Sequence, residues 1–264
     1  MRRVDLVCID VDGTLLDSTG AVPDEVWDAL GELRERGVRQ AICSGRPAFG
    51  VTAEYARRLD PAGWHIFQNG ASVVRLDTGE TRSMAIPRPV VERTVAAARR
   101  TGRVLELYTD YDVAAEQDAD RARRHAELLG VPFRPRAFET LQGPVVRAQW
   151  LIPHEEREAV LAEPHEGLNL CPSLAPLMPD TTFVNMTAAG VHKGSALARV
   201  AAAYGIPLER VMMVGDGEND IGAMRIAGLA VAMGNAEAAA LEAADVTVGH
   251  VDEGGLLEAL ALVG

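Results

Sequence analysis

Short apolar runs alternate with amphipathic, helix-like patterns in the first third and the last third of the chain. A short apolar run between polar turns predicts a buried strand, and apolar residues spaced three and four apart predict a helix. The N-terminal strands and helices predicted in this way are residues 4–10, 23–37, 38–43, 47–59 and 64–68. The same alternation returns between residues 193 and 249. It is typical of an α/β fold, a doubly wound, Rossmann-like parallel sheet with helices on both faces.

The middle of the chain has a different pattern. Residues 82–182 are richer in proline and arginine, and the predicted strands 103–110 and 147–153 are apolar on one side only. One-sided strands indicate an α+β unit with one sheet face exposed. Between Ser44 and Lys193 lie 148 residues, whereas a crossover between two strands needs only about 30. The surplus predicts a second domain.

We therefore predict a core made of residues 1–82 and 183–264, interrupted by an inserted α+β domain of residues 83–182. Proline stiffens the segments 86–89 and 177–182, which makes them the predicted hinges.

Polar residues follow the predicted core strands at their carboxyl ends, where ligands bind in open parallel sheets. Asp10 and Asp12 are two residues apart on an extended segment and therefore share one face. Asp216 and Asp220 follow the predicted strand 210–215. Four carboxylates in one site cannot all stay ionised without a compensating cation. Mg²⁺ suits oxygen ligands and is commonly shared with phosphate, so the pattern predicts a magnesium site.

Four segments of the sequence resemble the motifs of a known family. "DVDGTLL" (10–16), "SGR" (44–46), "HKG" (192–194) and "GDGENDIGAM" (215–224) are similar, in this order, to the four motifs of the haloacid dehalogenase superfamily, and more narrowly to its Cof-type phosphatases. "NGA" (69–71) and "MGNA" (233–236) extend the resemblance over almost the whole chain. The resemblance implies that the insertion is a C2-type cap. It also implies a Mg²⁺-dependent phosphomonoester hydrolase that acts on a small phosphorylated metabolite, such as a sugar phosphate, through an aspartyl-phosphate.

The resemblance also implies the catalytic roles. Asp10 is the expected nucleophile, and Asp12 is the expected acid and base, which protonates the leaving alcohol and then deprotonates water. Mg²⁺ is expected on Asp10, Asp12 (through its backbone carbonyl) and Asp216, with Asp220 acting through water or through Lys193.

The phosphoryl group is expected to contact Ser44 and the backbone beside it, with further contacts implied for other residues of the motifs. These phosphate-binding residues are Ser44, Gly45, Arg46, Lys193 and Asn219. Thr14 is expected mainly to cap a turn, and His192 to flank the lysine. "NG" at Asn69 and Gly70 fits either a substrate contact or a tight hairpin turn.

Lys193 is the only lysine of the chain. A compact ammonium reaches both the nucleophilic carboxylate and the transferring phosphoryl group, whereas the broad guanidinium of arginine crowds a site that also holds metal and phosphate. Lys193 is therefore expected to stabilise charge in the transition state.

Three other functions share part of this pattern. A phosphomannomutase-like transferase shares "DVDGT" and a similar cap, but "GDGENDIGAM" is closer to the phosphatases. Receiver-type signalling modules also combine aspartates, a hydroxyl and a lysine, but they have no inserted domain. An inactive binding protein has no support, because every motif carboxylate is present.

Composition and charge limit the classes of binding partner and the cellular location that we expect. The formal net charge of −12 argues against binding to nucleic acid or to an anionic membrane. No apolar stretch approaches the roughly 20 residues that span a bilayer. Three cysteines without a CxxC pair and an N-terminus unlike a signal peptide favour the cytoplasm. Neither the particular substrate nor the oligomeric state is predicted.

Overall fold

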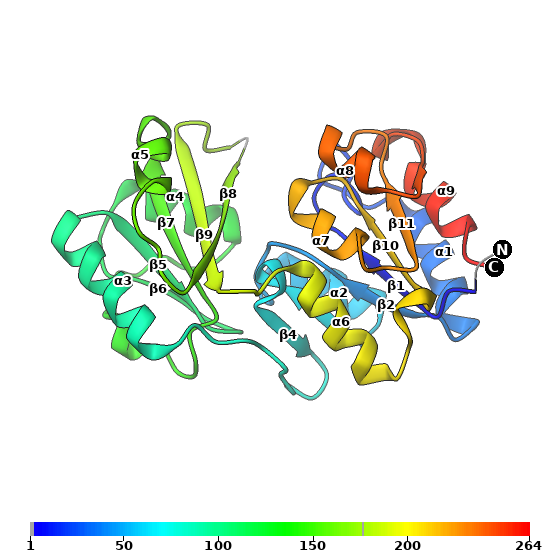
Figure 1. Ribbon diagram of the computed structural model, residues 1–264, viewed down its shortest axis with the longest axis horizontal. Helices are drawn as coiled ribbons and strands as arrows, with labels where there is room; N and C mark the ends of the chain where they lie inside the picture. The colour runs from blue at the N-terminus through cyan, green and yellow to red at the C-terminus, as the bar shows by residue number, and fades with distance from the viewer. Residues whose placement is uncertain (1–2, 176) are drawn as a thin grey trace. The chain divides into compact units, whose positions relative to one another are not determined.

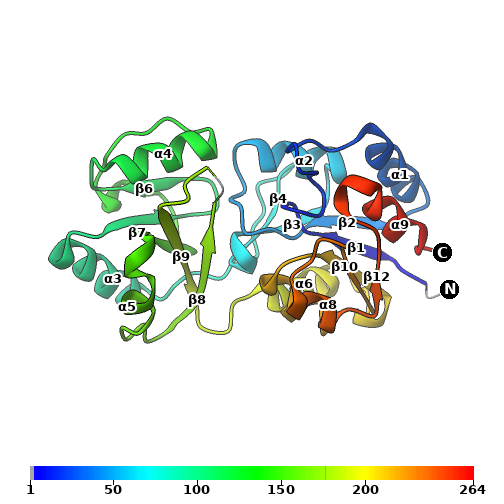
Figure 2. The same ribbon diagram turned by 90° about the horizontal axis from the view of Figure 1, so that it is seen from above.

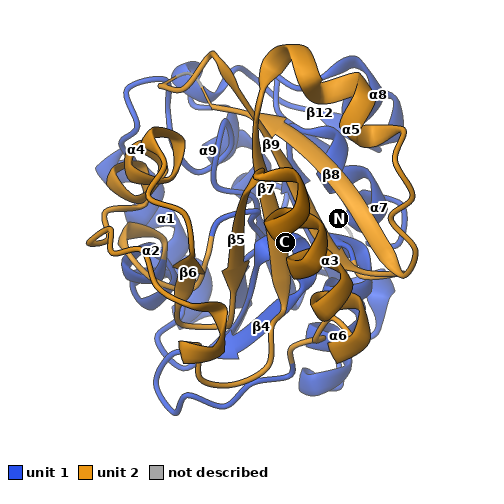
Figure 3. Ribbon diagram, turned by 90° about the vertical axis from the view of Figure 1, so that its left-hand side faces the viewer, with its two compact units in different colours: residues 1–46, 53–82, 192–264 blue, residues 47–52, 83–191 orange. Residues whose placement is uncertain are grey.

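A computed structural model describes residues 3–175 and 177–264. These residues form two compact units (Figure 3). Unit 1 consists of residues up to Arg46, Ala53–Arg82 and His192–Gly264, and unit 2 of Pro47–Thr52 and Ser83–Val191. No described helix is long and apolar enough to cross a membrane.

Unit 1 is built on a five-stranded parallel sheet with the strand order β12-β11-β10-β1-β2 (Figure 1). Its strands are β1 (Leu6–Ile9), β2 (Arg39–Ile42), β10 (Val211–Gly215), β11 (Leu229–Ala232) and β12 (Val246–Thr247). The central strand β1 is buried along its whole length, as the apolar run predicts. Because β10 and β2 pair with β1 on either side, the residues that follow these three strands meet at one edge of the sheet.

Helices cover both faces of this sheet (Figure 2). They are α1 (Asp24–Glu35), α2 (Val51–Leu59), α6 (Lys193–Tyr204), α7 (Ile221–Met224), α8 (Ala238–Ala243) and α9 (Gly255–Ala261). Leu6 and Cys8 of β1 belong to a buried cluster with apolar residues of α6, α7 and α8. On the opposite face, Gln40 donates a hydrogen bond to the carbonyl of Leu30 in α1. The predicted doubly wound α/β core is confirmed.

The third predicted strand lies outside the five-stranded sheet. β3 (Trp64–Phe67) pairs antiparallel with β4 (Ser72–Arg75) in a two-stranded sheet. A single parallel bridge between Cys43 and Ile66 joins β3 to the segment after β2. The prediction of strand structure was right, but the next strand in sequence, β4, forms its main partner.

Unit 2 contains a five-stranded antiparallel sheet with the order β6-β5-β7-β9-β8. Its elements are α3 (Arg88–Thr101), β5 (Val104–Tyr108), β6 (Val113–Ala115), α4 (Asp120–Leu129), β7 (Arg147–Pro153), α5 (Arg157–Leu161), β8 (Leu168–Leu174) and β9 (Thr181–Ala188). The prediction left one sheet face exposed. Instead, α4 packs on that face, while α3 and α5 lie on the other (Figure 2). His125 of α4 lies 2.8 Å from the Glu106 carboxylate of β5 and 4.8 Å, between ring centroids, from Phe183 of β9.

The main segment of unit 2 begins at Ser83, the first residue of the predicted insertion, but it extends beyond the predicted end at residue 182. The boundary expected after residue 182 falls inside β9, which pairs with both β7 and β8 and therefore stays in unit 2 up to Val191. Residues 177–182 include the first two residues of β9, and residues 86–89 include the first two of α3, so both predicted hinges lie inside unit 2.

Candidate active site

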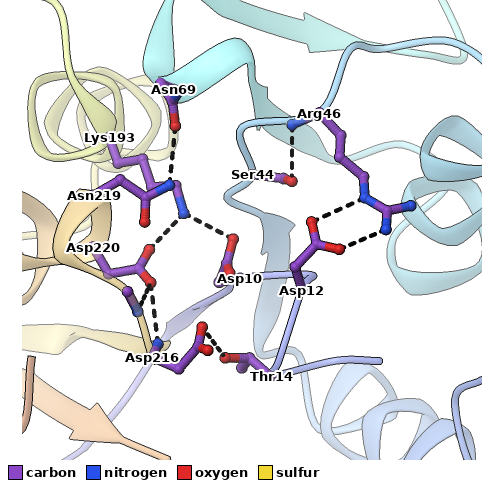
Figure 4. Close-up of polar contacts among 11 residues, drawn as sticks. Asp10, Asp12, Thr14, Ser44, Arg46, Asn69, Lys193, Asp216, Asn219 and Asp220 are labelled. Atoms are coloured by element: carbon purple, nitrogen blue, oxygen red, sulfur yellow. Dashed lines mark hydrogen bonds and ion pairs between the residues drawn. The ribbon is translucent and has the colours of Figure 1, made fainter. Parts of the chain in front are cut away.

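The predicted site residues of unit 1 converge at the carboxyl edge of the parallel sheet (Figure 4). Asp10 directly follows β1, Ser44 follows β2, and Asp216 follows β10. Lys193 is the first residue of α6, and Asp220 ends the short 3₁₀ helix η5 (Glu218–Asp220). Parallel strands in neighbouring positions bring these distant segments together, as expected for an α/β sheet.

Lys193 lies between two carboxylates. Its Nζ donates hydrogen bonds to Asp10 Oδ1 at 2.7 Å and to Asp220 Oδ1 at 2.6 Å. The residue is only 1% exposed, so both ion pairs are removed from solvent. Burial lowers the pKa of Lys193, but Asp10 and Asp220 together outweigh burial and raise that pKa above its ordinary value. Lys193 therefore holds a permanent positive charge next to the predicted nucleophile.

The start of α6 positions this lysine. His192 is the N-cap residue: its side chain accepts a hydrogen bond from the Ser195 backbone N–H, and Ser195 Oγ accepts one from the His192 N–H. Such a reciprocal capping box stabilises the first turn of a helix. A Cβ on Gly194 would lie 2.2 Å from the Gly222 carbonyl oxygen, so only glycine lets α6 approach α7 this closely. His192 was expected only to flank the lysine, and its capping role was not predicted from the sequence.

Asp10, Asp216 and Asp220 form an acidic cluster in which one carboxylate oxygen from each lies within 4.8 Å of the others. Burial raises the pKa of the Asp10 carboxyl well above its usual range, against the lowering effect of Lys193. Burial and the Asp220 charge raise the pKa of Asp216 to about 6. One lysine thus compensates the cluster only in part, and the donor set of carboxylate oxygens suits a hard divalent cation.

The three carboxylates are not equally available to a cation. Asp220 is fully buried: Oδ1 accepts from Lys193, and Oδ2 accepts from the backbone N–H groups of Asp216 and Gly217, both at 3.1 Å. Asp216 has two long contacts of 3.4 Å, from Thr14 Oγ1 and from Asn235 Nδ2. Asp220 is thus held as a support for its neighbours, whereas Asp216 keeps oxygens that are only weakly bonded.

Asp12 points away from the acidic cluster (Figure 4). Arg46 holds its carboxylate in a bidentate ion pair, with Nε 2.9 Å from Oδ2 and Nη2 2.5 Å from Oδ1. The Asp12 side chain is outside the group that could hold a metal ion, so the structure offers no side-chain metal ligand there. The Arg46 backbone N–H donates to the buried Ser44 Oγ at 3.1 Å. The guanidinium of Arg46, predicted to bind phosphate, contacts Asp12 in this structure.

Three residues make contacts in the site that were not predicted from the sequence. Thr14, expected to cap a turn, is buried and contacts Asp216. Asn235 bridges two segments, donating to the Gly13 carbonyl at 2.8 Å and accepting from the Val251 N–H at 3.0 Å. Asn69 Oδ1 accepts a hydrogen bond from Asn219 Nδ2 at 3.1 Å. "NGA" and "MGNA" were the available signals for the two asparagines, but neither string specifies a contact.

Comparison with known proteins identifies the family of this chain. Residues 7–260 match the family model of haloacid dehalogenase-like hydrolases. A 5-amino-6-(5-phospho-D-ribitylamino)uracil phosphatase of Bacillus subtilis (strain 168) is 28% identical over 259 residues, which cover 95% of this chain and 92% of the relative.

Two solved structures show the same fold. A haloacid dehalogenase-like hydrolase from Bacteroides thetaiotaomicron superimposes with a TM-score of 0.86 at 25% identity, covering 99% of this chain and 100% of that one. A sugar phosphatase of HAD subclass IIB superimposes with a TM-score of 0.80 at 26% identity, covering 98% of both chains.

The fold is that of the haloacid dehalogenase-like hydrolases and phosphatases. The chain belongs to the haloacid dehalogenase-like hydrolase family. Within this family it is similar to the Cof-type phosphatases, and it is an enzyme of the phosphatase class.

Proposed function

We propose that the protein hydrolyses a small phosphorylated metabolite with Mg²⁺, through a phosphoryl group carried transiently on Asp10. The observation that carries the proposal is the contact between Lys193 and Asp10, 2.7 Å apart and closed off from solvent. A carboxylate nucleophile beside a fixed ammonium is suited to attack a phosphorus atom that carries negative charge, because the ammonium offsets the repulsion between the two anions.

The reaction then takes two displacements. An Asp10 Oδ atom forms a bond to phosphorus while the bond from phosphorus to the ester oxygen breaks, and the departing oxygen takes a proton from Asp12. In the second step a water oxygen bonds to phosphorus, Asp12 takes a proton from that water, and the Asp10–phosphorus bond breaks. The products are the alcohol and inorganic phosphate, and Asp10 and Asp12 return to their starting states.

Arg46 has a role in this cycle that differs from a simple phosphate contact. The bidentate ion pair holds the exposed Asp12 carboxylate in one orientation, with both of its oxygens accepting hydrogen bonds from the guanidinium. Asp12 must carry a proton when the alcohol leaves. We therefore infer that the pair loosens when the phosphate ester binds, since the ester is a second anion that competes for the guanidinium.

Mg²⁺ would be held by Asp10, Asp216 and the backbone carbonyl of Asp12, while Asp220 would support Asp216 and Lys193 from behind. When bound, the ion would neutralise charge on the phosphoryl oxygens and on the carboxylate cluster. Ser44, the backbone at Gly45, Lys193 and Asn219 remain the proposed phosphate contacts.

Unit 2 is proposed to act as the C2-type cap that selects the leaving group. Relatives named for a ribitylaminouracil phosphate and for sugar phosphates support a small, polyhydroxylated phosphomonoester as the substrate class. Three large polar or aromatic residues of this unit, Arg136, Arg147 and Tyr108, already have partners within it. Arg147 and Tyr108 pack on each other, with the guanidinium carbon 3.8 Å from the ring centroid, and Arg136 pairs with Asp112, so a structural role explains these three.

The test is phosphate release from a panel of phosphomonoesters, with Mg²⁺ and with a chelator, by the wild type and by Asp10→Asn. We expect release that needs Mg²⁺ and that Asp10→Asn abolishes, because an amide cannot form the acyl phosphate. Release that persists in Asp10→Asn would refute the covalent route. Labelling of Asp10 by a phosphodonor without release, or a requirement for a bisphosphate activator, would instead identify a phosphomutase-like transferase.

A further inference from the structure

The turn between β3 and β4 has an unusual backbone. Gln68 and Asn69 have φ angles of 53° and 55°, and they are the only non-glycine residues of the described chain with positive φ; Gly70 follows at 93°. Three successive left-handed residues are disfavoured for side-chain-bearing positions and persist only where the surroundings impose them. The three residues are buried, which makes a mobile surface turn an inadequate explanation.

Contacts from two separate segments impose this conformation. The Gln68 N–H donates to the Arg46 carbonyl at 2.9 Å, and the Asn69 N–H donates to the Ser44 carbonyl at 3.0 Å. Arg199 of α6 donates through Nη2 to the Gly70 carbonyl at 2.6 Å. The turn is therefore bonded to the backbone of the predicted phosphate loop and to the helix that begins with the active-site lysine.

Gly70 makes the approach to this helix possible. A Cβ on Gly70 would lie 2.4 Å from the His192 carbonyl oxygen and 3.0 Å from the Lys193 backbone nitrogen. The turn thus sits directly against the residue pair that positions the Lys193 side chain.

The Asn69 side chain connects the turn to the fourth motif. Its Oδ1 accepts a hydrogen bond from Asn219 Nδ2 at 3.1 Å, across 150 positions of sequence (Figure 4). A Cβ on Gly45 would lie 3.1 Å from the same Oδ1, so the amide also lines the phosphate loop. A carboxamide with one fixed partner has one orientation, and Asn219 is thereby set for a contact with a phosphoryl oxygen.

We propose that Asn69 is a positioning residue of the active site, which fixes the carboxamide of Asn219 and the spacing of the Ser44–Arg46 loop for binding of the phosphoryl group. The proposal rests on the proposed function, since it presumes that Asn219 contacts phosphate. The strained backbone at Asn69 is the means by which the side chain reaches Asn219 from a hairpin that is otherwise outside the parallel sheet.

Two substitutions separate this role from a structural one. Asn69→Gly and Asn69→Ala both remove the amide, but glycine adopts positive φ without strain whereas alanine does not. We expect both variants to lose affinity for inorganic phosphate about tenfold, measured by titration calorimetry with Mg²⁺ present. We also expect kcat/KM to fall about tenfold to a hundredfold in both. Their thermal midpoints should differ, with Asn69→Gly above Asn69→Ala.

The coupling to Asn219 provides the second measurement. Asn219→Ala should weaken phosphate binding to a similar degree, and Asn69→Gly combined with Asn219→Ala should be no weaker than either single variant, because one interaction is lost in each case. Binding by Asn69→Gly within twofold of the wild type overturns the proposal. So does a double variant whose losses multiply, or an activity loss that follows the thermal midpoint and spares Asn69→Gly.

Calorimetry keeps this test separate from the proposed hydrolysis. A wild type that binds phosphate but releases none from any ester contradicts the proposed function while the Asn69 measurement still stands. A wild type that releases phosphate from esters but binds no free phosphate in the presence of Mg²⁺ overturns the Asn69 proposal and leaves the proposed hydrolysis standing.

Discussion

Replacing Lys193 by methionine removes the only buried cation from a cluster of acidic side chains. Methionine has a similar length and no charge, so the substitution deletes two ion pairs of 2.7 and 2.6 Å without opening a large cavity. Asp10 and Asp220 then face each other in a site with almost no access to solvent. Removing one partner of a buried ion pair leaves an uncompensated charge, which is a larger effect than the loss of the contact itself.

The expected loss of unfolding free energy is about 3 to 5 kcal/mol. The expected loss is no larger than this because one of the two carboxyl groups can take up a proton, which avoids the full cost of burying two like charges. Proteins of this size are stable by only about 5 to 15 kcal/mol in total, so the variant should unfold at a clearly lower urea concentration. The measurement is urea unfolding at pH 7.5 with a chelator, which prevents a bound cation from replacing the lost charge.

Lys193→Arg is the matched variant, because it retains the charge and changes only its shape. The guanidinium is a broad, planar group, and the lysine side chain is fully enclosed. We expect phosphatase activity to fall at least about a hundredfold in Lys193→Arg, close to the loss in Lys193→Met, while the arginine variant keeps more of its stability. Turnover by Lys193→Arg within threefold of the wild type would refute the steric argument, and an unchanged unfolding free energy in Lys193→Met would refute the electrostatic one.

Two further predictions concern the β3–β4 hairpin. Gly70→Ala should lower the free energy of unfolding by at least about 2 kcal/mol, because it combines a φ of +93° with a Cβ 2.4 Å from a backbone oxygen. The control is Gly79→Ala, which has a φ of +72° but no atom within 4 Å and so measures the effect of φ alone. Equal losses of unfolding free energy in the two variants would contradict the close-approach argument. Burial lowers the pKa of His65 to about 4, so the neutral ring is the folded form and the unfolded chain takes up the extra proton between pH 6.5 and pH 4. The stability that comes from the neutral His65 ring is fully present above pH 6.5, and the free energy of unfolding falls by about 3 kcal/mol as the pH drops toward 4. His65→Gln should show a flatter pH dependence of the unfolding free energy. Parallel curves for the variant and the wild type would rule out His65 as the cause.

The buried His65 ring makes two hydrogen bonds that no sequence pattern reveals. The Ile42 backbone N–H donates to Nδ1 at 3.2 Å, and Nε2 lies 2.9 Å from the Asp60 carbonyl oxygen. A ring that accepts at one nitrogen and donates at the other is neutral, and here it satisfies an N–H group on the open side of strand β2. In the sequence His65 is only a polar residue within an apolar run.

The sequence by itself determined the α/β core and most of the candidate site. Asp10, Asp12, Ser44 and Asp216 follow predicted strands, and strand ends meet at one sheet edge whenever parallel strands are neighbours. The hydrophobic period and the residue type at the end of each strand are local properties, so they can be predicted without a structure. Lys193 could also be selected from the sequence, because it is the only lysine of the chain.

Only the tertiary structure decided how these groups are paired. It placed Arg46 on Asp12, gave both oxygens of Asp220 to Lys193 and two backbone N–H groups, and joined Asn69 to Asn219. It also moved the second boundary of unit 2 beyond β9. The physical reason is the same in each case: a hydrogen bond or a strand pair depends on distances within about an ångström between residues far apart in sequence, and periodicity carries no information about such distances.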